Sequence, residues 1–441
     1  MIIMTRIHQG SNWLYNYTSM NKKSAFIAGE TYVPVSGKVF DRAEIDNAIE
    51  AAEDGWWTEG RWAKKFEGQF GQYLGANHVT LVNSGSSANL NALASLTSKI
   101  WGDSQLKPGD EYITCAVGFP TTVNPGVQHG LVPVFVDAEL DTFNIDAAKI
   151  EAAITPKTKL LMFAHTLGKP YNLEIIMALR KKYKLWVIED CCDALGSTYD
   201  KKLVGTFGDI ATFSFYPAHQ ITMGEGGAIV TNNPLLHREI RKFRDWGRDC
   251  YCDPGKDNTC GRRFKWKLGE LPYGYDHKYI YSQIGYNLKL TDFGPAIGVA
   301  QLAKLPKFIK RRKVNYQTLY KFFSQYPDYF HLLTTGDKED PCWFGFPLLV
   351  KETAPFTRND LTEYLELHKI GTRNIFSGNL LRHPAYTDIK KKRVMGKMTV
   401  ADRVMNQACW LGVFPGIQAP QMRYVLKTLS EFIKQIPTLT A

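Results

Sequence analysis

The chain has 441 residues, of which 44% are hydrophobic and 22% charged, a composition typical of a globular protein of about two or three domains. That composition excludes a disordered chain and a collagen-like repeat, and eight cysteines are too few for a disulfide scaffold. The formal net charge of +11 suits an anionic small substrate or an acidic protein partner at least as well as a nucleic acid. Because no nucleic-acid-binding motif accompanies this charge, we expect no nucleic-acid partner.

The N-terminal sequence gives no sign of export. Met1 to Arg6 runs directly into polar residues, so the apolar core of a signal peptide is missing. No stretch reaches the roughly 18 uninterrupted apolar residues of a membrane helix. We therefore expect a cytoplasmic protein without a membrane segment, in which clustered thiols indicate a metal or catalytic site rather than disulfides.

The first half of the chain alternates short apolar runs with amphipathic segments. Strands are predicted over 78–82, 111–115, 132–136, 160–164 and 185–189, and helices over 85–97, 146–154 and 173–182. Apolar strands separated by helices predict an α/β fold with a mainly parallel sheet covered on both faces. Ligands of such sheets bind at the carboxyl ends of the strands, so chemistry is expected just after each strand.

The second half is organised differently. Residues 236–290, rich in charge, glycine, proline and tyrosine, indicate a long ordered insertion. Helices are predicted over 294–309, 316–323, 359–368 and 420–433, and a strand over 343–350. We therefore expect an N-terminal arm (1–35), a large domain (36–305) that carries the insertion, and a small C-terminal α+β domain (306–441).

Two motifs follow predicted strands. The turn 83–88, Asn-Ser-Gly-Ser-Ser-Ala, opens a helix with small residues whose backbone N–H groups can bind a phosphate, although many strand-to-helix turns use such residues. Asp190 ends the strand 185–189 and fits either a helix N-cap or a carboxylate that keeps a pyridine nitrogen protonated.

A third motif makes a family resemblance visible. The segment 211–220, Ala-Thr-Phe-Ser-Phe-Tyr-Pro-Ala-His-Gln, is followed by Gly-Glu-Gly-Gly at 224–227. Together with 57–60, 84–88 and 285–287, it resembles the DegT/DnrJ/EryC1/StrS sugar aminotransferases, which are fold-type I enzymes that depend on pyridoxal phosphate. The resemblance covers nearly the whole chain.

One departure from that family changes the expected chemistry. His219 stands where the family carries the lysine that forms a Schiff base with the cofactor. Imidazole cannot form an imine, but it can move a proton near neutral pH. The resemblance therefore implies unattached pyridoxamine 5'-phosphate as cofactor and disfavours ordinary transamination.

The cysteines provide a second departure. Cys192, Cys250, Cys252 and Cys260 have the spacing C-x57-C-x-C-x7-C, which by itself leaves tetrahedral zinc and a 2Fe–2S cluster equally open. The resemblance to the histidine-bearing 3-dehydrases of the family implies a 2Fe–2S cluster on these four cysteines. Cys191 competes with Cys192, because adjacent residues of an extended segment face opposite sides, and the family spacing favours Cys192.

The resemblance also implies roles for other residues. Phe119 stacks on the pyridine ring, Gly85 and Ser86 bind the phosphate together with Ser214, and the Asp190 carboxylate keeps the ring nitrogen protonated. Asn287 reaches the phosphate of a neighbouring subunit, which implies a homodimer. His219 is the catalytic base. Asp193 and Tyr216 either tune proton transfer around the cofactor oxygen or are packing residues. Arg373, His383 and Tyr386 are candidate contacts of the nucleotide sugar.

The expected function is dehydration and deoxygenation at C-3 of a nucleotide 4-keto-6-deoxyhexose, with CDP-4-keto-6-deoxy-D-glucose as the implied substrate. An NAD(P)H-dependent flavin/iron–sulfur reductase is the implied electron donor, in 3,6-dideoxyhexose and O-antigen biosynthesis. Two alternatives stay open: a pyridoxamine-dependent 3-dehydratase that needs no external electrons, and a non-catalytic aminotransferase-fold protein with structural zinc.

Overall fold

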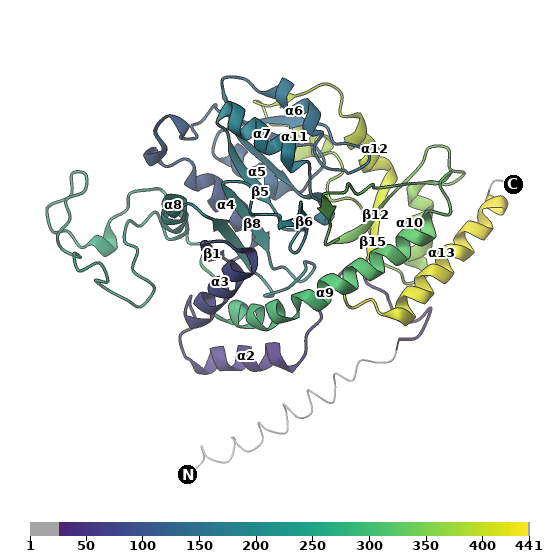
Figure 1. The fold of residues 1–441 in the computed structure, drawn as a ribbon, viewed down its shortest axis with the longest axis horizontal. Coiled ribbons are helices and arrows are strands. Elements are labelled where there is room, and N and C mark those ends of the chain that lie inside the picture. Colours follow the sequence, from purple (N-terminus) through teal and green to yellow (C-terminus); the bar gives the residue numbers. More distant parts are fainter. Residues whose placement is uncertain (1–25, 440–441) are drawn as a thin grey trace, which may run out of the picture.

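The computed structural model describes residues 26–439, and an eight-stranded sheet forms the centre of the larger domain (Figure 1). Its strand order is β1-β9-β8-β5-β4-β2-β3-β14. The strands are β1 (His78–Val82), β9 (Gly227–Thr231), β8 (Ile210–Ser214), β5 (Trp186–Asp190), β4 (Thr158–Ala164), β2 (Glu111–Cys115), β3 (Val132–Val136) and β14 (Arg393–Val394). β9 runs antiparallel to both β1 and β8, and the other pairings are parallel.

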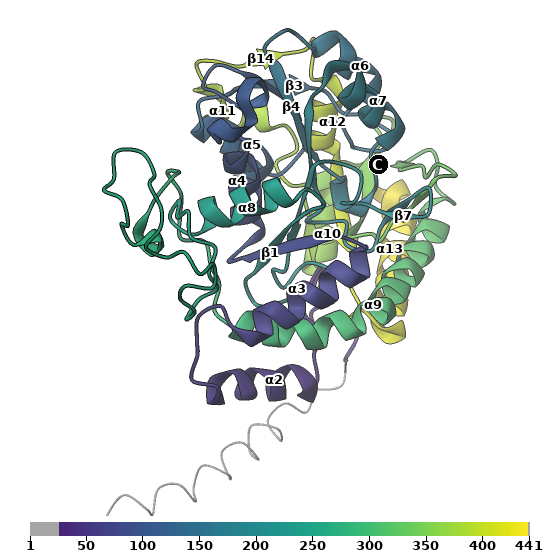
Figure 2. The ribbon, with the colours of Figure 1, turned by 60° about the vertical axis from the view of Figure 1, so that its left-hand side comes forward.

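Helices cover both faces of this sheet, which is why its strands are apolar throughout. Figure 2 shows α4, α5 and α8 on one side of the strands and α6 and α7 on the other. The helices of this domain are α2 (Arg42–Glu53), α3 (Arg61–Leu74), α4 (Gly85–Ser95), α5 (Pro120–Gln128), α6 (Ala147–Ala153), α7 (Leu173–Tyr183) and α8 (Pro234–Arg244). The mainly parallel α/β sheet predicted from the sequence is confirmed.

A smaller C-terminal part contains a four-stranded antiparallel sheet. Its strands, in the order β10-β12-β15-β13, are β10 (Phe330–Leu332), β12 (Gly345–Val350), β15 (Ala408–Gly412) and β13 (Thr372–Arg373). The helices here are α10 (Arg358–Leu367), α11 (Pro384–Thr387), α12 (Thr399–Gln407) and α13 (Ala419–Leu439). A small third sheet combines β6 (Thr198–Tyr199), β7 (Lys202–Leu203) and β11 (Glu339–Asp340).

A shared helix and a shared sheet connect the large and the C-terminal parts, which the sequence predicted as separate domains. One helix, α9 (Phe293–Phe323), spans the two stretches of predicted helical periodicity and runs across the expected boundary near residue 305. β14 extends the edge of the large sheet from the C-terminal half. Of the N-terminal arm, residues 1–25 lie outside the described residues, while Val33 bridges to Ile370 of the C-terminal part.

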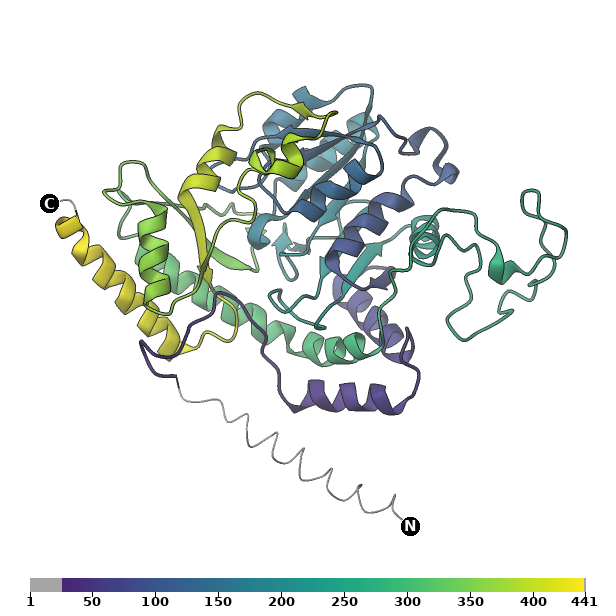
Figure 3. The ribbon, with the colours of Figure 1, turned by 180° about the vertical axis from the view of Figure 1, so that it is seen from behind.

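The insertion begins later than predicted. Residues 236–244 belong to the regular helix α8, whose N-cap is Asn233, and the irregular segment runs from 245 to 292. Its one helical turn is a 3-10 helix at His277–Tyr279. Figures 1 and 3 show this segment projecting from the side of the large domain. Among residues 26–439, none of the helices is long and apolar enough to cross a membrane.

Candidate active site

A cavity of about 750 Å³ opens at the carboxyl ends of β1, β2, β4, β5 and β8. This is the edge at which parallel α/β sheets bind ligands, and the volume suits a small-molecule site. Most of the site residues predicted from the sequence line this cavity. Those lining it are Gly85, Ser86, Phe119, Asp190, Cys192, Asp193, Ser214, Tyr216 and His219.

The first turn of α4 forms one end of the cavity. Ser84 is the N-cap, and its hydroxyl accepts a hydrogen bond from the Ser87 amide at 3.1 Å. A Cβ on Gly85 would lie 2.5 Å from Ser214 Cβ, closer than real atoms approach, so only glycine fits between this turn and the end of β8. The free backbone N–H groups of a helix start bind anions. The turn therefore forms a phosphate-sized cradle.

Asp190 is held rigidly at the end of β5. Its Oδ2 accepts hydrogen bonds from Asn89 Nδ2 at 2.8 Å and Thr122 Oγ1 at 2.7 Å. Asn89 is oriented in turn by Thr212, whose hydroxyl donates to Asn89 Oδ1 at 2.6 Å. The Cys192 amide donates to the other carboxylate oxygen at 3.1 Å. These three donors fix the carboxylate in place; Asn89, Thr122 and Thr212 were not predicted from the sequence.

His219 and Asp193 face each other in the cavity, with Nδ1 and Oδ1 3.7 Å apart. Burial and the Arg312 guanidinium lower the pKa of His219 to about 3. Burial and the Asp190 carboxylate raise the pKa of Asp193 to about 8. At neutral pH the imidazole is thus neutral and the carboxyl protonated, so the two do not form an ion pair. A neutral imidazole can accept a proton.

Arg312 of α9 holds the loop that carries His219. Its guanidinium is fully buried and donates to the carbonyl oxygens of His219 at 2.9 Å and Phe344 at 3.0 Å. The Phe344 ring contacts the His219 ring with centroids 5.2 Å apart. Both residues were missed by sequence reasoning, because a basic residue on a long helix and a phenylalanine before a strand give no local signal of a site.

Aromatic residues and the C-terminal part form the remaining walls. Phe119 and Tyr216 are each 51% exposed, and Phe119 packs edge-on against Phe376. Arg373 lines the cavity as expected of a substrate contact. The other two candidates do not line it. His383 pairs with the Ser377 carbonyl, and the Tyr386 hydroxyl donates to Asn124.

Asn287 lies outside this cavity. Its backbone bridges to Asp245 at the base of the insertion, and its side-chain oxygen accepts a hydrogen bond from Lys289 Nζ at 2.7 Å. The role predicted for it concerns the cavity of a second subunit, so it stays a prediction.

The four predicted cluster ligands are divided between two places. Cys192 lines the large cavity, close to Gly85 and Ser214. Cys250, Cys252 and Cys260 line a separate small cavity inside the insertion. The described chain therefore brings three of the four together and leaves Cys192 apart from them. The cysteines expected to be core residues are buried: Cys115, Cys191, Cys342 and Cys409.

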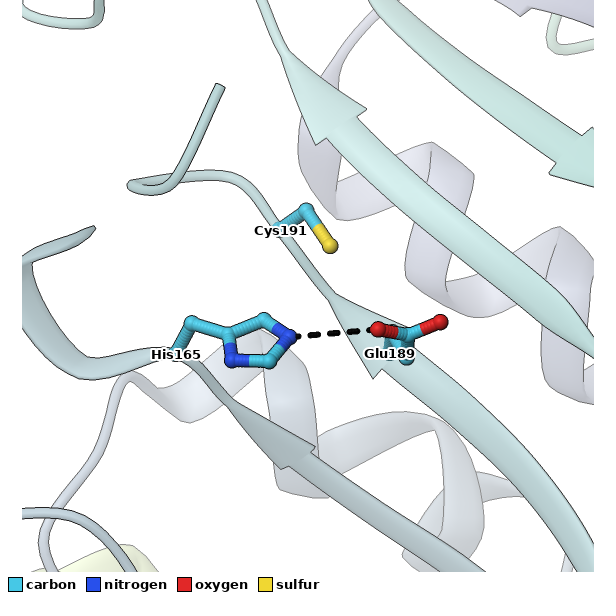
Figure 4. A group of neighbouring side chains, drawn as sticks. All are labelled: His165, Glu189 and Cys191. Carbon is cyan, nitrogen blue, oxygen red and sulfur yellow. Dashed lines mark hydrogen bonds and ion pairs between the residues drawn. The ribbon is translucent and has the colours of Figure 1, made fainter. Parts of the chain in front are cut away.

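A compact group of potential metal ligands lies at the carboxyl end of β5 (Figure 4). His165, Glu189 and Cys191 are the one set of three ligand atoms within 4.8 Å of one another in the described part of the chain. Glu189 accepts hydrogen bonds from the amides of residues 205, 207 and 208 and from the His165 ring. Because these bonds occupy the carboxylate, the group is a structural brace rather than a metal site.

The chain belongs to the DegT/DnrJ/EryC1/StrS aminotransferase family, whose model matches residues 39–430. It is 53% identical over 407 residues to the lipopolysaccharide biosynthesis protein RfbH of Salmonella typhimurium, covering 92% of this chain and 93% of that protein. It is 47% identical over 418 residues to dTDP-4-dehydro-2,6-dideoxy-D-glucose 3-dehydratase of Saccharopolyspora spinosa, covering 95% of this chain and 90% of that protein.

Solved structures agree with this assignment. Escherichia coli GDP-4-keto-6-deoxy-D-mannose-3-dehydratase with bound hydrated pyridoxal phosphate superposes with a TM-score of 0.80 at 28% identity, covering 91% of this chain and all of that one. A mutant GDP-4-keto-6-deoxymannose-3-dehydratase with bound GDP-perosamine also superposes with a TM-score of 0.80 at 28% identity, covering 90% of this chain and 100% of that one. The predicted fold-type I architecture is confirmed.

Proposed function

We propose that the protein is a pyridoxamine 5'-phosphate-dependent 3-dehydrase that removes the C-3 hydroxyl of a nucleotide 4-keto-6-deoxyhexose and couples this step to reduction. CDP-4-keto-6-deoxy-D-glucose is the proposed substrate, for 3,6-dideoxyhexose synthesis in an O-antigen pathway. The observation that carries the proposal is the position of His219, which lines the cavity at the carboxyl edge of the sheet in the motif where this family otherwise carries a lysine. The cytoplasmic location expected from the sequence stays a prediction.

The cavity fits the cofactor at three points. The α4 turn with Gly85 suits the phosphate, and the Asp190 carboxylate, fixed by three donors, suits a protonated ring nitrogen. The exposed face of Phe119 suits stacking on the ring. When bound, pyridoxamine phosphate supplies an amine for the sugar ketone and a ring that takes up electrons.

No lysine of the described residues takes the place of His219 in the cavity. The residues that line the cavity, all within the described range, include no lysine. Lys169 is buried and bonded to Glu339, and Lys201 lies exposed in the turn between β6 and β7. Without a lysine amine in reach, the cofactor would stay unattached to the protein. A dehydrase requires this, whereas a transaminase needs a lysine that binds the cofactor.

Different side chains of the cavity would then transfer protons and bind the diphosphate of the substrate. With pyridoxamine phosphate bound, the imidazole of His219 would accept a proton from the aminomethyl carbon, and the protonated Asp193 beside it would be a hydrogen-bond donor. Tyr216 lies on the same loop and fits delivery of a proton to the departing hydroxyl. Arg373 supplies a positive charge from the C-terminal part for the substrate's diphosphate.

Deoxygenation needs a reductant. Replacing the C-3 hydroxyl by hydrogen consumes two electrons and two protons and releases one water. A 2Fe–2S cluster transfers single electrons, and the three thiols gathered in the insertion are its natural ligands. We propose an NAD(P)H-dependent flavin/iron–sulfur reductase as the donor, and a homodimer in which Asn287 completes the partner's phosphate site.

The test uses anaerobically purified protein supplied with pyridoxamine phosphate and CDP-4-keto-6-deoxy-D-glucose, with and without dithionite. We expect a product lighter by one oxygen only with reductant, measured by mass spectrometry. His219→Asn should abolish solvent deuterium exchange at the aminomethyl carbon, whereas His237→Asn, a histidine stacked on His78 away from the cavity, should leave it intact. Turnover without reductant would favour the electron-independent dehydratase, and undiminished exchange in His219→Asn would refute the base role.

A further inference from the structure

Gln220 follows His219 in the loop between β8 and β9, and it is buried, with 2% of its surface exposed. Its side-chain nitrogen Nε2 donates hydrogen bonds to two backbone carbonyl oxygens, that of Asp193 and, at 3.2 Å, that of Cys342. A carbonyl oxygen only accepts hydrogen bonds, so this position needs a side chain with two donors. The amide group of Gln220, and not only its shape, therefore makes the contact.

The two acceptors lie on segments that are far apart in the sequence and that both border the active site. Asp193 follows β5 of the large domain, and its carboxyl group faces the His219 imidazole. Cys342 lies two residues before Phe344, whose ring contacts the His219 ring. Gln220 thus joins the His219 loop, the turn after β5 and the start of the C-terminal sheet at one point.

The packing around the two carbonyl groups is tight. Gly168 has a φ of +91°, and a Cβ at this position would lie 2.5 Å from the Cys342 oxygen and 3.0 Å from the Asp193 oxygen. The Ser197 hydroxyl donates to the Gly168 carbonyl at 2.6 Å and accepts from the Cys342 amide at 2.8 Å. The two carbonyl oxygens are thus held beside each other, where a single amide group can bind both.

Arg312 does not supply the same connection. In the described part of the chain, its hydrogen bonds reach the carbonyl groups of residues 218, 219, 343 and 344, but not Asp193. The side chains of His219 and Asp193 are 3.7 Å apart, which is too far for a hydrogen bond. Their relative position therefore depends on the backbones that carry them, and Gln220 bonds one of these backbones to the loop of the other.

We propose that Gln220 is a positioning residue of the reaction, whose amide aligns the Asp193 carboxyl group with the His219 imidazole and ties this pair to the C-terminal part. This inference rests on the roles that the proposed function gives to His219 and Asp193. Gln220 is not among the described residues that line the large cavity, and the proposed cofactor contacts lie on other segments. Loss of its amide should therefore slow proton transfer and leave cofactor binding unchanged.

The test measures solvent deuterium exchange at the aminomethyl carbon of pyridoxamine phosphate bound to the full-length protein. Gln220→Met keeps the length of the side chain and removes both donors. We expect exchange about 10- to 100-fold slower than in wild type, with the cofactor affinity changed by less than about twofold. Gln220→Asn, whose amide is one carbon shorter and cannot reach both carbonyl groups, should also be slow. The matched control is Gln105→Met, which removes an amide bonded to the Thr97 carbonyl at 2.9 Å outside the cavity and should exchange as wild type does.

A double variant separates alignment of the pair from general stabilisation of the fold. If Gln220 acts through the Asp193 carboxyl group, Gln220→Met should slow exchange by less than about threefold in an Asp193→Ala background. An equal loss in both backgrounds would refute the positioning role. So would a wild-type rate in Gln220→Met and Gln220→Asn, or a loss of cofactor affinity as large as the loss of rate.

The same measurements distinguish failure of this inference from failure of the proposed function. Absence of exchange in the wild-type protein, or a wild-type rate in Asp193→Ala, would refute the roles proposed for the pair and with them the role of Gln220. Slow exchange in Asp193→Ala together with a wild-type rate in Gln220→Met would refute the role of Gln220 alone.

Discussion

The protonation state of Asp193 offers the most direct test of the electrostatics of the site. Its pKa of about 8, against an ordinary 3.8, means that the folded protein keeps a proton which the unfolded chain releases above about pH 4. Stability contributed by such a group is therefore present at low pH and is lost as the pH rises toward 8. At 1.36 kcal/mol per pH unit, the loss between about pH 5 and pH 8 is about 4 kcal/mol.

Asp193→Asn removes this titration while keeping the shape of the protonated acid. We expect the free energy of unfolding of the variant, relative to wild type, to rise by about 4 kcal/mol between pH 5 and pH 8. Urea unfolding of the cofactor-free proteins across this range measures the difference. A difference that changes by less than about 1 kcal/mol would refute the reasoning, because Asp193 would then be ionised and paired with His219.

Three further variants test the cavity. Gly85→Ala should weaken pyridoxamine phosphate binding about 10- to 100-fold, because the new Cβ overlaps Ser214; equilibrium dialysis measures the affinity. The control is Gly68→Ala, which has open space around its Cβ and should bind the cofactor as wild type does. Asp190→Asn should lower single-turnover rates about 10- to 100-fold, because the ring nitrogen loses a charged partner; an unchanged rate would contradict that role. Arg312→Met should move the acid limb of aminomethyl exchange to higher pH, since the guanidinium lowers the pKa of His219. An unmoved limb would show that burial alone sets that pKa.

Local patterns in the sequence determined much of the fold and part of the site. The strands 111–115 and 132–136 were predicted at their observed bounds, because short runs rich in β-branched and aromatic residues are a local property. Asp190, Ser214 and His219 were found because each lies in a recognisable motif, at or just after the end of a strand. The edge of a parallel sheet then brings them into one cavity.

Contacts between distant segments were decided only by the tertiary structure. β14 (Arg393–Val394) comes from the C-terminal half and pairs with β3 of the large sheet, and Arg312 reaches the His219 loop from α9; neither has a periodic signal. The cysteine spacing predicted that Cys192 joins the three thiols of the insertion, and spacing counts residues and not distances. Folding places Cys192 in the large cavity and the other three thiols in a separate small one, so the shared ligand set stays a prediction.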